Sequence, residues 1–176
     1  MKKKQCCRFA LLAALLFLLS ACGQPQKDPG DVPRDFASVD METAEISPEV
    51  LAVHLLAETA FDDALIQIDP AIAGRLYGIE GLYDSLAAYG STGATAEAIL
   101  VVACPDAETA AEAAGSIERY RAEMTDIYAD YNPKESGKLR RAVLDCDGRY
   151  VVFCAAPDPD AARAAYHAFV AESIPS

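Results

Sequence analysis

The stretch RRAVLDCDGRYVVFCA, residues 140–155, decides the fold of this chain. It holds two apolar segments, about 140–146 and 149–155, and is rich in the β-branched and aromatic residues that favour strands. Asp147-Gly148 stands between them and favours a tight turn, because glycine adopts a positive φ without steric cost. The sequence therefore predicts an antiparallel β-hairpin here.

A second pair of apolar segments lies earlier in the chain, at about 82–89 and 96–104. The loop between them contains Gly90-Ser91-Thr92-Gly93, and a short connection with glycine at both ends suits a hairpin. Two hairpins predict an antiparallel sheet of about four strands.

The helices are predicted from their start and stop signals. Proline at the first helical position, aspartate or serine before it, and glycine or proline after the last turn are typical of helix ends. These signals are Ser47-Pro48 for a helix over 48–59, Asp69-Pro70 to Gly78 for a short one, Asp106 to Asn132-Pro133 for a long amphipathic one, and Pro157-Asp158-Pro159-Asp160 for the last. The predicted order is α-α-β-β-α-β-β-α, an α+β fold with an antiparallel sheet packed against helices.

The segment 1–21 has the order of an export signal. Basic residues, Lys2 to Lys4 and Arg8, precede an apolar run from Phe9 to Leu19, and Leu19-Ser20-Ala21-Cys22 follows. The run is shorter than the roughly 20 residues needed to span a bilayer. Leu-Ser-Ala-Cys resembles the lipobox of bacterial lipoproteins, which implies cleavage between Ala21 and Cys22 and lipid on the Cys22 sulfur. The alternative is an ordinary secretory signal with an incidental cysteine.

The predicted organisation is a signal peptide over 1–21, a flexible tether over 22–47 and one globular domain over 48–176. The tether is predicted because its proline, glycine and scattered charges leave little apolar surface to bury. Removing the segment 1–21 removes four basic and no acidic residues, so the formal charge of −12 becomes −16. Such a charge repels phosphate backbones, so we expect no nucleic-acid partner.

Three cysteines remain in the predicted domain, Cys104, Cys146 and Cys154. Cys104 and Cys154 both lie near the ends of strands that precede helices, so one alternative is a disulfide between them. The other, which we favour, is three free thiols, because cysteine often packs as a small hydrophobic residue.

Candidate residues for chemistry are few. His54 and His167 lack the pairing of a zinc site and are interpreted as solvated, and Asp145-Cys146-Asp147-Gly148 lacks the first and last acidic ligands of a calcium loop. Gly90-Ser91-Thr92-Gly93 lacks the lysine of a phosphate loop and is interpreted as a tight connection. The sequence thus predicts no catalytic residue, metal site or cofactor.

Glu97 and three tyrosines leave two interpretations open. Glu97 shares a strand face with Ile99, and it either lines a ligand cleft or, as we favour, sits at the exposed start of the strand. The tyrosines Tyr128, Tyr131 and Tyr150 either add an aromatic contact surface or pack at the sheet edge.

Four segments together resemble the domain-of-unknown-function 4358 family, short lipoproteins found mainly in Gram-positive bacteria. They are Leu76-Tyr77-Gly78-Ile79, the stretch from Tyr89 to Ile99, Tyr131-Asn132-Pro133, and Asp147-Gly148-Arg149-Tyr150-Val151. The resemblance implies a location and a fold and supplies no activity.

We therefore expect a lipid-anchored protein on the extracytoplasmic face of the cell membrane. Without a visible nucleophile or metal cluster, a noncatalytic binding or interaction module is favoured, and the alternative is an enzyme with a dispersed active site. The expected partners are an envelope or membrane protein, or a small polar or cationic solute. We expect the contact surface at the sheet and its hairpin loops, near Ser91 and Arg149.

Overall fold

The hairpin predicted at residues 140–155 is present in the computed structural model, which describes residues 45–173. Its strands are β4 (Val143–Asp147) and β5 (Tyr150–Ala155), and Asp147 pairs with Tyr150. The turn therefore falls on Gly148-Arg149, one position later than predicted. Gly148 has a φ of 55°, in the left-handed region where a side chain is strained.

The two predicted hairpins form one antiparallel sheet. β2 (Ser85–Gly90) pairs with β3 (Ala98–Ala103), and β3 pairs in turn with β5, with Val101 opposite Val152. A fifth strand, β1 (Ile66–Ile68), pairs with β2 at the sheet edge. The strand order is β1-β2-β3-β5-β4, so the two hairpins meet at their inner strands.

Five helices accompany the sheet in the described part of the chain, and the α+β class is confirmed. They are α1 (Pro48–Glu58), α2 (Pro70–Tyr77), α3 (Ala107–Tyr131), α4 (Pro133–Arg141) and α5 (Pro159–Ser173). Predicted caps form hydrogen bonds at α2 and α3: the Asp69 carboxylate accepts from the amides of Ala71 and Ile72, and Asp106 accepts from that of Thr109. Ser47 lies at the N-cap position of α1, but its side chain makes no capping hydrogen bond.

Strand β1 and helix α4 were not predicted. β1 is very short and its first two positions are exposed, so it lacks the alternation that indicates a half-buried strand. Asn132-Pro133 was interpreted as a helix stop, and it does end α3. Because proline also suits a first helical position, the same pair begins α4.

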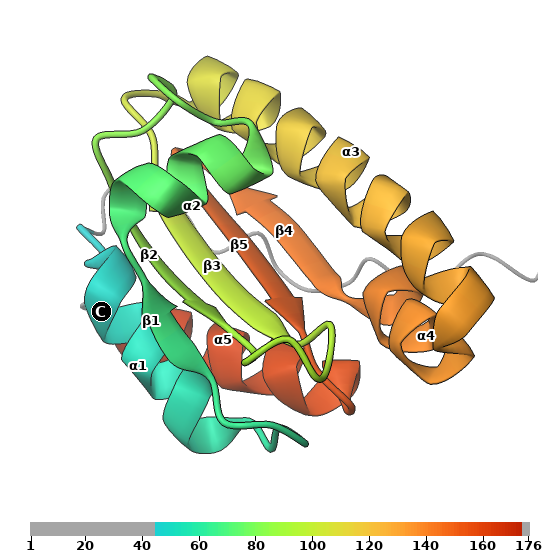
Figure 1. Cartoon of the computed structure of the whole chain (residues 1–176). Helices are drawn as coiled ribbons and strands as arrows, with labels where there is room; N and C mark the ends of the chain where they lie inside the picture. The colour runs from blue at the N-terminus through green and yellow to red at the C-terminus, as the bar shows by residue number, and fades with distance from the viewer. Residues whose placement is uncertain (1–44, 174–176) are drawn as a thin grey trace, which may run out of the picture. The chain divides into compact units, whose positions relative to one another are not determined.

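Helices cover both faces of the sheet, which produces two separate cores (Figure 1). On one face α1 and α5 pack on Ile99, Val101 and Val152. On the other α2 and α3 pack on Leu100 and Phe153. Burial on both faces explains why β3 and β5 are continuous apolar runs.

The predicted signal peptide, the Ala21–Cys22 cleavage site and most of the predicted tether lie outside the described residues. The last tether residues do lie within them: Ile46 is buried in the core, and its amide donates to the Tyr150 hydroxyl at 2.9 Å. Both cores lie within residues 46–170, so a chain that begins at Gly23 retains them completely. Over residues 45–173, no helix has the length and apolar character needed to cross a membrane.

Candidate ligand-binding site

Helix α4 places a buried lysine at one end of the sheet. The Nζ atom of Lys138 lies 2.6 Å from Glu97 Oε1, 2.9 Å from Asp62 Oδ2 and 3.0 Å from Glu135 Oε1. The lysine side chain is only 2% exposed. An ammonium group has three N–H donors, so the three carboxylates satisfy it completely. We call these four residues the Lys138 cluster.

Glu97 is the centre of this cluster. Its carboxylate accepts from the amides of Asp62 and Asp63 and from the Thr95 hydroxyl, in addition to Lys138. The interpretation that Glu97 sits at an exposed strand start is therefore wrong. The residue precedes β3 directly and is buried, because α4 and the segment after α1 close over it.

The charges of the cluster stabilise one another. Burial lowers the pKa of Lys138, but the hydrogen bonds to Glu97, Asp62 and Glu135 raise it further, so the net shift is upward. The hydrogen bonds from Lys138 and Lys134 lower the pKa of Asp62 from 3.8 to about 2. Lys138 and Asp62 are therefore both ionised at neutral pH.

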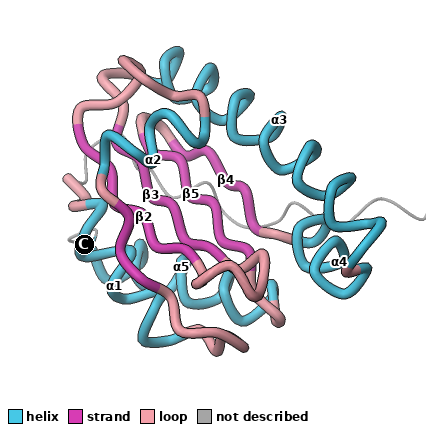
Figure 2. Tube along the Cα trace, viewed as in Figure 1, coloured by secondary structure: helices cyan, strands magenta, loops and turns pink. Residues whose placement is uncertain are grey.

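The cluster fixes the loop between β2 and β3, which lies at the same end of the sheet as α4 (Figure 2). The amide of Ala96 donates to Glu135, and both the amide and the hydroxyl of Thr92 donate to Asp63. The Ser91 amide donates to the Glu97 carbonyl, and the Gly93 amide to the Ser91 hydroxyl. These amides are occupied by the protein itself, so the loop is a tight connection, as predicted.

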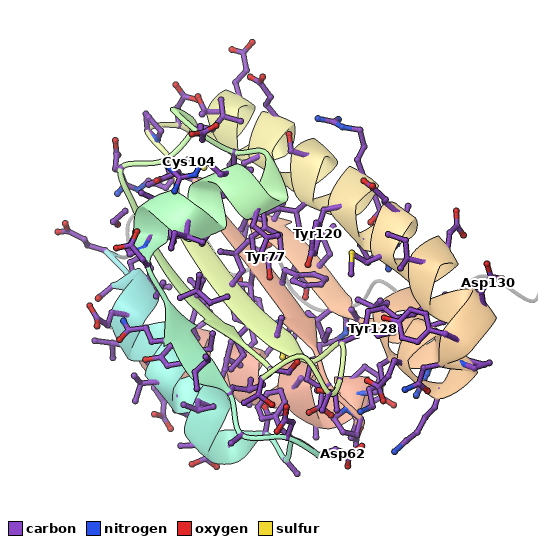
Figure 3. The ribbon with its side chains drawn as sticks, in the orientation of Figure 1. Asp62, Tyr77, Cys104, Tyr120, Tyr128 and Asp130 are labelled. Carbon is purple, nitrogen blue, oxygen red and sulfur yellow. The ribbon has the colours of Figure 1, made fainter. Side chains whose placement is uncertain are left out.

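A pocket of about 180 Å³ opens beside this loop. It lies on the sheet face covered by α2 and α3, and Figure 3 shows Tyr77 and Tyr120 between these helices, with Tyr128 farther along α3 toward α4. Its remaining wall is mostly apolar, with Ser91, Thr95 and Glu97 as the polar residues, and the others are Ile68, Leu76, Gly90, Gly93, Ala96, Ala98, Met124, Leu139 and Phe153. An apolar pocket with a few polar groups is the usual form of a small-molecule site.

Two of the pocket tyrosines, Tyr77 and Tyr120, pack against each other. The rings of Tyr77 and Tyr120 meet edge to face, with centroids 4.5 Å apart, and Tyr77 also meets Phe153 at 6.0 Å. The Tyr128 hydroxyl donates to the Thr95 carbonyl at 3.3 Å, which ties α3 to the loop. Burial raises the pKa of Tyr77 and Tyr120, and that of Tyr128 to about 12. All three phenols are therefore protonated at neutral pH.

The other candidate residues lie away from this pocket. His54 Nε2 lies 3.2 Å from the Ala165 carbonyl and its ring packs on Phe169, so this histidine joins α1 to α5 instead of being solvated. His167 is half-buried beside Tyr166, at 5.2 Å between ring centroids.

The carboxylates of the hairpin β4–β5 bind protein groups. Asp145 pairs with Arg163 at 3.0 Å, and Asp147 accepts from the Tyr166 hydroxyl at 2.6 Å, so both hold α5 against the hairpin. Over residues 45–173 no group of three or more His, Cys, Asp or Glu side chains is arranged so that it could hold a metal ion. Of the tyrosines considered as a contact surface, Tyr150 is buried in the core and Tyr131 is exposed.

The three cysteines are free thiols. The prediction that Cys104 and Cys154 could be neighbours in the sheet is wrong, because β3 and β5 are antiparallel. Cys154 pairs with Ile99, at the opposite end of β3 from Cys104. The two thiols also belong to different cores. Burial raises the pKa of Cys104 to about 11 and that of Cys154 to about 12. The pKa of Cys146 is also raised, mainly by burial and to a lesser extent by the negative charge of Asp147.

This arrangement predicts the labelling pattern of the thiols. In the chain from Gly23 to Ser176 with Cys22 absent, iodoacetamide at pH 7.5 should modify only Cys146, which is exposed. Unfolding in urea without reductant should make all three thiols reactive, as intact-mass analysis will show. A pair of cysteines that resists labelling after unfolding would reveal a disulfide and contradict this arrangement.

Sequence reasoning missed Lys138, Glu135 and Asp62, and it identified Tyr77 only as part of a family-like segment. The available signal for the cluster was the i,i+3 spacing of Glu135 and Lys138 after a proline, which is typical of an ion pair on a helix. That signal gives no indication of burial, since such pairs are mostly solvated.

The comparisons with known proteins give one match. The family model described as a domain of unknown function (DUF4358) matches residues 61–156, which include β1 to β5, the β2–β3 loop and α4. No curated protein and no solved structure matches this chain.

Proposed function

We propose that this chain, which belongs to the family of domain of unknown function 4358, is a noncatalytic binding protein. Its ligand site is the tyrosine-lined pocket between α2 and α3. The observation that carries this proposal is the pocket itself, with its apolar wall and its loop held in place by the Lys138 cluster. A binding site benefits from such a preordered wall because less ordering entropy is lost when the ligand binds.

The location is part of the same proposal. Cys22 is lipidated, the segment 1–21 is removed, and the domain is tethered at the extracytoplasmic face of the cell membrane. The support for this is the basic, apolar and small-residue order of the sequence from Met1 to Cys22. The ligand is then a small solute outside the cytoplasm, and an envelope or membrane protein is the competing kind of partner.

The protonation states of the reactive groups favour binding over catalysis. A thiol or amine acts as a catalytic nucleophile only in its deprotonated form. The pKa of each of the three thiols is raised by burial, and the pKa of Lys138 is raised by its three carboxylates. Cys104, Cys154 and Lys138 are therefore held in their protonated, unreactive forms at neutral pH, and Cys146, the exposed thiol, does not line the pocket.

A fragment screen by two-dimensional amide NMR on the chain from Gly23 to Ser176 tests the site. We expect mixed small fragments to shift the amides of Leu76, Gly93 and Ala96 at the pocket. Val50 and Val53, exposed on α1 at the opposite sheet face, are the matched control for nonspecific apolar contact. Shifts confined to α1, or none at all, would refute the site, and turnover abolished by a single pocket substitution would establish an enzyme instead.

A further inference from the structure

The size of the pocket restricts its ligand to about one ring. Its volume is about 180 Å³. A cavity of about 150 Å³ in another protein is large enough to hold benzene. A disaccharide or a peptide is much larger than this pocket, whereas a six-membered ring with one small substituent fits it.

Two phenol groups in the pocket have hydrogen-bonding capacity that the protein does not use. Tyr77 is only 2% exposed, and the structure gives its hydroxyl no hydrogen-bond partner among residues 45–173. That hydroxyl is not sealed in the core either, because within that range Thr59 Oγ1 is the single fully buried side-chain oxygen without a partner. The Tyr77 hydroxyl therefore reaches the pocket space, and the Tyr120 hydroxyl beside it is likewise unpaired among those residues.

These hydroxyls act as hydrogen-bond donors toward a ligand. Because the pKa of each phenol is raised by burial, neither ionises at neutral pH. A ligand oxygen that accepts from one of these hydroxyls replaces pocket water, and one such hydrogen bond strengthens binding about two- to tenfold. The ligand consequently needs a carbonyl or hydroxyl oxygen on its ring.

The charges around the pocket favour an uncharged ligand. Among the described residues that line it, Glu97 alone is charged, and its carboxylate is already saturated by Lys138 and three other donors. An ionic ligand would lose its hydration here without gaining a counter-ion. Cation–π attraction to Tyr77 does not replace the missing counter-ion of a cationic ligand, because Tyr120 and Phe153 already pack around that ring.

We infer that the pocket between α2 and α3 binds an uncharged, single-ring-sized molecule with an apolar body and one oxygen acceptor, which is oriented by the hydroxyls of Tyr77 and Tyr120. The inference rests on the proposed function and specifies the ligand class of that same site.

Three probes of matched size test the ligand class: acetophenone, which is neutral with a carbonyl oxygen, phenyltrimethylammonium, which is cationic, and benzoate, which is anionic. Each is titrated into the chain from Gly23 to Ser176, and amide shifts at Gly93 and Ala96 report binding. Acetophenone should bind most tightly. Tyr77→Phe removes only the hydroxyl and should weaken acetophenone binding about two- to tenfold, the effect of one hydrogen bond. Tyr89→Phe, at a side chain that packs against the core on the opposite sheet face, is the matched control and should bind like wild type.

The outcomes separate this inference from the proposed function. Tighter binding of phenyltrimethylammonium or benzoate at the same amides overturns the ligand class and leaves the site in place. Equal acetophenone affinity in Tyr77→Phe and Tyr120→Phe overturns the role of the hydroxyls. If no probe shifts the pocket amides the inference fails, and the proposed function fails with it only when the mixed fragment screen is also negative. Near-UV circular dichroism of each variant verifies that its fold is intact.

Discussion

Replacing Lys138 with methionine should destabilise the folded domain by about 3–5 kcal/mol, because it removes the cation that three carboxylates share and leaves buried charge without a partner. Glu97 and Glu135 are both buried, so water cannot replace the lost ammonium group. Domains of this size are stable by about 5–15 kcal/mol, so the change removes a large fraction of the total. Urea unfolding measures it as a lower midpoint at an unchanged slope.

Lys134→Met is the matched control. Lys134 also pairs with Asp62, at 2.9 Å, but its side chain is 72% exposed. Exposed ion pairs contribute about 0–1 kcal/mol, so this variant should unfold close to wild type. A loss of similar size in both variants would mean that the buried position of Lys138 has no special role.

Acid should reduce the difference between Lys138→Met and wild type. In the folded protein the pKa of Asp62 is lowered, chiefly by the hydrogen bond from Lys138, to about 2 from an ordinary value of 3.8. A lowered folded-state pKa stabilises the fold above the ordinary value, and this stabilisation is lost as the pH falls through the folded value. The gap in stability should therefore narrow between about pH 4 and pH 2.

Local signals in the sequence are sufficient for most of the fold. The Asp147-Gly148 hairpin, the Asp69 and Asp106 caps and the continuous apolar run of β3 each depend on residues within a few positions of one another. Such local interactions can be predicted from the sequence without knowledge of any tertiary contact. The missed strand β1 depends instead on a nonlocal contact. It exists only through its pairing with β2, which lies beyond α2 in the chain.

The candidate site was mostly inaccessible to sequence reasoning for the same reason. A lysine is normally solvated, and Lys138 is buried only because α4 brings it to Glu97, 41 residues away, and to Asp62, 76 residues away. Tyr120 and Met124 lie on a stripe that predicted core contacts. They do face the sheet, but the stripe alone does not indicate that the space in front of them is a pocket.

The N-terminal proposal predicts the largest change in behaviour. Wild-type protein isolated from the membrane fraction should begin at Cys22 and have the added mass of acyl chains, each of which contributes about 0.8 kcal/mol per buried methylene to membrane binding. Cys22→Ala should abolish the acyl mass completely and leave a precursor that retains the segment 1–21. Intact-mass analysis is the required readout, because an uncleaved apolar run from Phe9 to Leu19 still binds membranes without spanning them.

Cys7→Ala is the matched control for this prediction, since Cys7 lies in the segment that is removed and the mature protein should be identical to wild type in mass. Extraction with alkaline carbonate adds a second test, because it releases proteins held by charge and leaves lipid-anchored ones in the membrane. The large negative charge of the mature chain gives it no electrostatic attraction to anionic lipids, so retention after extraction must come from the acyl chains. Wild-type protein without acyl mass would exclude the lipid anchor, and the tyrosine pocket would then belong to an unanchored domain.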